Sequence, residues 1–387
     1  MDSIWVLLIP LPCTKGGQVY DVDPEADTVI IVPPGTEPFA PWDPKSDQIQ
    51  NGSKNALSQS GVRINVSSRH LTLASGIFRR KLNHFSRNTS VQPDGRIHLY
   101  TSQRFDPRAA AIVMNAVHAK GFKMPKAVDL ETLAQIAFFA DTFGLLEAVS
   151  VYVELWALKL QGQFPEIYNR DLILWIYISH VFRLDEPFKA ATRIAAIYSD
   201  GPIRNLGLPL QHGVVAAIDV RRQELVARSL STVYGILDSL SGGAATCDES
   251  HCDSLLLGTL IKLLSKKGIL WPRPAKPFTG VSYTAIIDDM ARLSQHLGGR
   301  AAKAVNGVNG TTKHHANGTN GVHVNGVNGV HKPLTKTSKG QGGEVHLSGT
   351  HPGKPAVHHC GAMRLVAGFG QLDALADEVE GVELETV

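Results

Sequence analysis

The chain has 387 residues, 43% of them hydrophobic, which is enough to form a sizeable core in two or three domains. Its formal net charge is only +3, and no basic stripe follows a helical period, so specific nucleic-acid binding is not expected. Four scattered cysteines are too few for a disulfide scaffold. Reduced thiols, and therefore an intracellular location in cytoplasm or nucleus, are expected.

Residues 4–12 form an apolar N-terminal stretch that two hypotheses can explain. A signal peptide has such a core, but a basic segment before it is missing and Pro10, Pro12 and Lys15 make a poor cleavage site. The stretch is also too short to cross a bilayer, so no membrane contact is expected. We favour the second hypothesis, a disordered N-terminal extension over residues 1–22.

Three short strands are predicted next, at 28–32, 62–66 and 96–100. An acidic lead at 23–27 introduces the first strand. Residues 33–60 are rich in Pro, Asn, Ser and Gly, and this composition predicts a disordered insertion between the first two strands. A helical hairpin over 67–82 separates the second strand from the third, and the three strands are expected to form one sheet.

Three helices follow the third strand. Asp106 and Pro107 predict the start of the first, because Asp caps helices and Pro suits the first turn; its end is expected near Gly121. Asp129 starts the second helix, which Gly144 ends, and the third covers 146–160. The side chains expected to be buried are those of Leu71, Leu73, Ile77, Phe78, Leu133, Ile136 and Phe139.

Residues 163–290 have a mainly helical pattern, and the composition changes after them. Gly, Asn and His dominate a region with Asn-Gly-Val repeats, such as 306–308 and 325–330. This region cannot bury enough apolar area to offset chain entropy, so 291–387 is predicted to be a disordered tail. Its acidic end, 373–385, alternates acids with Leu and Val. Two hypotheses remain for it: a segment that folds on a basic partner, or a solubilising tail.

Residues able to support catalysis or metal binding are sparse. Cys247 and Cys252, with His251 between them, match one half of a zinc site, but the second pair of ligands is missing. No nucleophile elbow, phosphate loop or metalloprotease pair occurs, and His118 and His180 are interpreted as ordinary helix residues. We therefore predict no catalytic residues, no metal, no cofactor and no enzyme activity.

The segment 62–101 resembles a BTB/POZ domain, in particular the divergent form of filamentous fungi. In that family a His-Leu pair opens the first helix, and here it is His70-Leu71. The family joins this helix to the next through a motif that here reads Ala74-Ser75-Gly76-Ile77-Phe78. The resemblance implies an α+β fold: a BTB core of a small three-stranded sheet covered by helices over 23–162, a helical companion region over 163–290 and the disordered tail.

The resemblance implies binding to other proteins. One hypothesis is an adaptor or a self-associating scaffold, a homodimer included; recruitment of substrates to a cullin-type ubiquitin ligase is its narrower form. The alternative is a transcription-linked scaffold with no ubiquitin role. Cullin-binding members often carry Tyr-Thr-Gly where this chain has 117–121, so an aromatic side chain in place of His118 is expected to strengthen cullin binding. The residues expected at the interaction surface are Tyr100, Phe105, His118 and Lys120.

Overall fold

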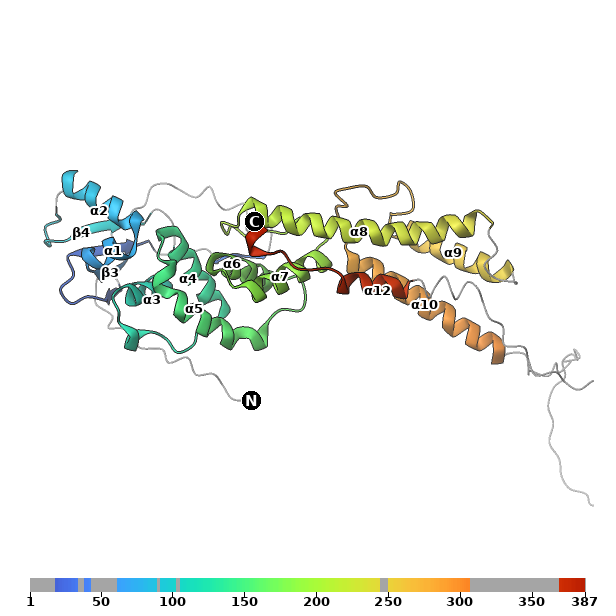
Figure 1. Cartoon of the computed structure of the whole chain (residues 1–387), viewed down its shortest axis with the longest axis horizontal. Coiled ribbons are helices and arrows are strands. Elements are labelled where there is room, and N and C mark those ends of the chain that lie inside the picture. The colour runs from blue at the N-terminus through green and yellow to red at the C-terminus, as the bar shows by residue number, and fades with distance from the viewer. Residues whose placement is uncertain are drawn as a thin grey trace, which may run out of the picture.

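The structure is a computed structural model that describes residues 18–33, 38–42, 61–88, 91–101, 105–243, 250–306 and 369–386. Most of the predicted insertion, the Asn-Gly-Val repeats and Cys247 lie outside these residues. Within them the fold is α+β: a small mixed sheet is followed by helices that extend to one side of it (Figure 1).

The sheet contains four strands in the order β1-β3-β2-β4. β2 is antiparallel to β3 and parallel to β4, with Ile30 opposite Ile64 on one side and Leu99 on the other. Every side chain of the central strand β2 is buried, which explains its continuous apolar sequence. The predicted strands therefore share one sheet, and the bounds are β1 Val19–Asp21, β2 Thr28–Val32, β3 Val62–Val66 and β4 Ile97–Tyr100.

The fourth strand, β1, corrects the predicted N-terminal extension. Residues 19–21 were expected to be disordered, but they pair in parallel with β3, and Tyr20 is opposite Ile64. Burial of Tyr20 and of nearby Val22 supplies the apolar contact that holds this edge strand. Three residues are too few to show an alternating pattern, so this strand carries no clear signal in the sequence.

The helices around the sheet begin where their caps were predicted. The Asp106 carboxylate accepts the Ala109 N–H at 2.7 Å, and the Asp129 carboxylate accepts the Thr132 N–H at 2.7 Å. Gly144 ends α4 in the left-handed conformation at φ 63°, which favours glycine. The bounds are α1 Ser68–Ala74, α2 Gly76–Asn88, α3 Pro107–Val117, η2 Gly121–Lys123, α4 Leu130–Phe143, α5 Leu146–Leu160 and η3 Gln161–Gln163.

One of the side chains predicted to be buried is exposed in the structure. Leu71, Phe78, Leu133, Ile136 and Phe139 are buried, and Ile77 is partly buried against the same core. Leu73, in contrast, is 80% exposed. Two residues correspond to about 200° around a helix, so Leu73 points away from the core face that Leu71 occupies.

Ser75 joins α1 to α2 at the centre of the motif that resembles BTB/POZ domains. Its buried hydroxyl accepts the Ile77 and Phe78 N–H groups at 3.1 Å each and donates to the Phe143 carbonyl. The side chain thus caps α2 and ties the hairpin to the end of α4.

We expect Ser75→Ala to lower the free energy of unfolding by about 1–3 kcal/mol, because it leaves buried polar groups without partners. Urea denaturation followed by circular dichroism measures this loss. Ser67→Ala is a matched control, since the Ser67 side chain makes no capping hydrogen bond to α1. Equal losses in the two variants would show that the Ser75 bridge contributes nothing specific.

The helices after the sheet divide between two hydrophobic clusters. The apolar side chains of α6 and α7 pack into the same cluster as the sheet and α3–α5. The C-terminal half of α8 packs instead with α9 and α10. α8 contributes side chains to both clusters, and Figure 1 shows this long helix extending from beside α7 to beside α9. The division at 162 therefore stays a prediction, because apolar packing continues across it. The bounds are α6 Arg170–Phe182, α7 Asp185–Tyr198, α8 His212–Ser241, α9 Ser250–Lys266 and α10 Tyr283–Asn306.

The predicted disorder from 291 is wrong at both ends of the tail. α10 continues to Asn306; Met290 and Leu293 pack in the second cluster, and residues 300–305 are rich in helix-forming Ala. The last residues form α12 Gly370–Asp377 and η4 Leu384–Thr386, which pack on the other helices. In the parts of the chain that the structure describes, every helix is too short or too polar to span a lipid bilayer.

Candidate protein-interaction site

Two of the four predicted interaction residues lie where a partner can reach them. Tyr100 is 52% exposed at the end of β4, which is an edge strand of the sheet. Lys120 is half-buried and follows α3 at the start of the short turn η2. Their role in binding remains a prediction.

Phe105 is buried, which corrects its assignment to the interaction surface. Its ring packs against three phenylalanine rings of α4, with centroids 5.1–5.5 Å away, those of Phe138, Phe139 and Phe143. Aromatic groups at such distances pack favourably in a core. Phe105 therefore fixes the start of α3 against α4.

His118 is also buried, so the comparison with Tyr-Thr-Gly does not concern a surface position. Its Nδ1 donates to the Met114 carbonyl at 2.8 Å, and its Nε2 accepts the Ser67 N–H at 2.9 Å. The ring stacks on His70, with centroids 4.7 Å apart. An aromatic side chain here would break both hydrogen bonds without reaching a partner. The expected gain in cullin binding from His118→Tyr is therefore withdrawn.

Acid should destabilise the fold through His118, whose pKa is lowered mainly by burial and also by nearby His70. The unfolded chain, with a histidine pKa near 6.5, then binds more protons than the folded chain, so the free energy of unfolding falls as pH drops below about 7. We expect His118→Gln to reduce this pH dependence between about pH 7 and pH 5. Urea denaturation across that range measures it.

His212→Gln, at an exposed position, is the control, and its free energy of unfolding should depend on pH as in the wild type. Burial also lowers the pKa of His180, and this residue contributes equally to the pH dependence of stability in the wild type and in both variants. An unchanged slope in His118→Gln would contradict the prediction.

Asp23, His70 and His118 form a group whose ligand-type atoms lie within 4.8 Å of one another. Both ring nitrogens of His118 already have hydrogen-bond partners, so Asp23 and His70 are left to offer ligands. Structural zinc requires four ligands. These three residues therefore fit a stacked histidine pair with a carboxylate better than a metal centre.

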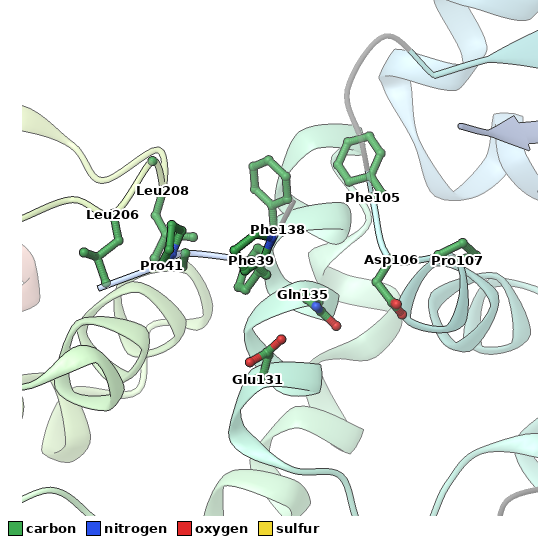
Figure 2. Close-up of a pocket in the computed structure, with 13 residues that line it drawn as sticks. Phe39, Pro41, Phe105, Asp106, Pro107, Glu131, Gln135, Phe138, Leu206 and Leu208 are labelled. Carbon is green, nitrogen blue, oxygen red and sulfur yellow. The ribbon is translucent and has the colours of Figure 1, made fainter. Parts of the chain in front are cut away.

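A cavity of about 400 Å³ lies between the start of α3, α4 and the turn at 206–208 (Figure 2). Phe39 and Phe138 line it beside two carboxylates, those of Asp106 and Glu131. Both carboxylates have structural partners: Asp106 caps α3, and Glu131 binds Arg170 at 2.7 Å. The cavity thus has the size of a small-molecule site, but its acids already hold other groups.

Residues 38–42 form one side of this cavity, although the whole insertion 33–60 was predicted to be disordered. Arg170 donates to the carbonyls of Phe39 and Ala40 at 2.8 and 2.9 Å. Arg204 donates to the Trp42 carbonyl at 3.2 Å, and its guanidinium lies 4.7 Å from the Trp42 ring. The two arginines hold the segment through these hydrogen bonds and through the contact between Arg204 and the Trp42 ring. Its aromatic residues were the signal that the sequence analysis missed.

An apolar stripe on α5 is the exposed surface that the sequence analysis did not identify. Val151, Leu155 and Leu158 are 66%, 55% and 62% exposed. Their spacing of four and three residues places them on one face of the helix. Contiguous exposed apolar groups commonly mark sites of protein association. Trp156 and Leu160, on the opposite side of α5, are buried in the core.

Asp141, Tyr177 and His180 form another titratable group in the described part of the chain. The Tyr177 hydroxyl donates to Asp141 at 3.4 Å, and burial raises the pKa of both Asp141 and Tyr177. None of the three lines the cavity, so this group does not combine with it into a site.

Comparison of the chain with protein families, curated proteins and solved structures gave no match.

Proposed function

We propose that the chain is a non-enzymatic protein-binding adaptor of the BTB/POZ type. Two strands, a helical hairpin, one strand and three helices follow in the expected order, and the strands share one sheet. The Ser75 hydrogen bonds give the Ala-Ser-Gly-Ile-Phe motif a structural role at the junction of the hairpin. These features support the resemblance on which the role depends.

The α5 stripe, Val151, Leu155 and Leu158, is the observation that carries the proposal. Leaving three large aliphatic side chains in water forgoes stabilisation that burial would provide. A partner with a complementary apolar face would recover it. Recruitment to a cullin is the narrower form of this role, and a homodimer is the form in which a second copy supplies the apolar face.

The test uses the tagged full-length chain and a variant with Leu155→Asp and Leu158→Asp. We expect the wild type to retain a defined set of proteins in quantitative affinity mass spectrometry, and the variant to lose them. Leu73→Asp is the matched control, because Leu73 is also an exposed leucine but lies on α1. It should keep the same partners.

Two measurements separate the forms of the proposal. Titration with a purified cullin scaffold tests recruitment, and light scattering of the purified wild type tests self-association. Identical partner sets for wild type and the α5 variant would overturn the proposed surface. Turnover of a substrate by purified protein would overturn the non-enzymatic role.

A further inference from the structure

The C-terminal residues 369–386 pack against helices that precede them by more than 60 residues in the chain. α12 contacts α8, and η4 contacts α7. Figure 1 shows this segment, in red, running along the helices from α10 toward the start of α8. The acidic end therefore meets its binding surface within the same chain.

Apolar side chains anchor the segment at both ends. Phe369 and Leu372 are buried in the cluster of α8, α9 and α10. Val382 and Leu384 are buried in the cluster that contains α7 and the sheet. Val379, between these anchors, packs against both clusters.

Four basic side chains of α7 and α8 line the same path. Lys189 pairs with Glu383 at 2.9 Å, and Arg228 pairs with Glu378 at 2.6 Å. Arg193 donates to the carbonyls of Ala376 and Val379, and Arg221 donates to that of Glu380. We call this surface the α7–α8 groove; its residues are Lys189, Thr192, Arg193, Arg221 and Arg228.

The groove also selects by shape at one position. A side chain on Gly381 would place its Cβ 2.0 Å from the Lys189 carbonyl oxygen, too close for any real contact. Next to it, the Val382 N–H donates to the Thr192 hydroxyl at 2.8 Å. Glycine is thus required where the segment crosses α7, and the backbone of the following residue is fixed by hydrogen bonding, with the Val382 side chain buried.

The contacts of residues 378–384 suit a segment that can leave. The side chains of Arg228 and Glu378 are more than half exposed, and ion pairs at such sites are weak and screened by salt. Two aliphatic side chains of this stretch, those of Val382 and Leu384, are buried. The covalent connection compensates, because a tethered ligand acts at an effective concentration of about millimolar.

We propose that the α7–α8 groove is a recognition site for acidic linear peptides containing a Gly-Val-x-Leu core, and that this chain's own C-terminal segment occupies it as a displaceable intramolecular ligand. The partner is a protein that presents such a peptide and competes with residues 378–384. A second copy of the chain offers the same segment without the tether, so the intramolecular contact prevails over exchange between copies. The site is separate from the α5 stripe and does not rest on the proposed adaptor role.

The test measures fluorescence anisotropy of a labelled peptide with the sequence of residues 374–387, mixed with the full-length chain. Gly381→Ala in the chain should undock its own segment while leaving the groove intact. This variant is expected to bind the peptide at least about tenfold more tightly than the wild type. Glu385→Ala, at an exposed position in the same segment, is the matched control and should bind like the wild type.

Two further variants identify the groove as the binding surface. Adding Arg193→Glu and Arg221→Glu to the Gly381→Ala chain should abolish binding, and a peptide that itself carries Gly381→Ala should not bind. The α5 variant with Leu155→Asp and Leu158→Asp should bind like the wild type. A negative outcome for the α5 stripe in the partner experiment would therefore leave the peptide-binding result unaffected.

Equal peptide binding by the wild-type and Gly381→Ala chains would overturn the proposal. A second measurement covers a variant that folds poorly: a protease site is inserted after Asp377 in the wild-type sequence and cleaved, which releases residues 378–387 and leaves the Phe369 and Leu372 anchors in place. After dilution below micromolar concentration, the released C-terminal fragment should separate from the rest of the chain in gel filtration. A fragment that remains bound would show a permanent structural element, and the proposal would fail.

Discussion

Replacing Arg222 with Met is expected to destabilise the chain by about 3–5 kcal/mol, because it leaves a carboxylate and two carbonyl groups without their buried partner. The Arg222 side chain is fully buried and pairs with Asp219 at 2.7 Å. It also donates to the carbonyls of Pro277 and Phe278 at 2.6 and 3.3 Å. Arg222 thereby connects α8 to the turn that precedes α10.

Urea denaturation at neutral pH measures this loss, and Arg108→Met, at an exposed position on α3, is the control. A second variant distinguishes the buried charge from the lost packing. Asp219→Asn combined with Arg222→Met should be less destabilised than Arg222→Met alone, since no uncompensated carboxylate remains. A loss below about 1 kcal/mol in Arg222→Met would contradict the prediction.

The second large effect is expected from Trp175→Ala. The Trp175 ring is buried and packs on Phe164 with centroids 5.1 Å apart, within the cluster that also contains the sheet. Removing so large a buried side chain costs about 3–5 kcal/mol. Because the packing is continuous, we expect the sheet to lose stability together with α6.

Native-state hydrogen exchange tests this coupling directly. The amides of β2 should exchange faster in Trp175→Ala than in the wild type, in parallel with those of α6. Trp271→Ala is the control, since Trp271 is 74% exposed. If the β2 amides keep their protection while α6 opens, residues 23–162 form an independent domain, as the sequence predicts.

Elements whose signals are local could be predicted from the sequence. Asp106, Asp129 and Gly144 act within one turn of their helices, and each lies where the structure begins or ends a helix. The apolar sequence of 28–32 indicated a strand, and the structure buries all of it at the centre of the sheet. Such signals depend only on residues that are close in the sequence, so the elements can be predicted without knowledge of the fold.

The motif around Ser75 was also visible in the sequence, but its physical role was not. The Ser75 hydroxyl bonds to Phe143, 68 residues further along the chain. The burial of His118 likewise depends on residues far away in the chain, and here the prediction from the sequence was wrong. The sequence analysis placed this residue at the interaction surface, whereas the structure buries it, with its ring stacked on His70 and a hydrogen bond from the Ser67 N–H.

The positions of three short or polar segments could not be predicted, because they depend on contacts that exist only in the folded chain. Residues 19–21, 38–42 and 369–386 are short or polar, so composition predicts disorder for each. Each becomes ordered through distant partners: β3 for the first, Arg170 and Arg204 for the second, and the second cluster together with the α7–α8 groove for the third. The free energy that fixes such a segment comes from contacts far apart in sequence, which no local pattern contains.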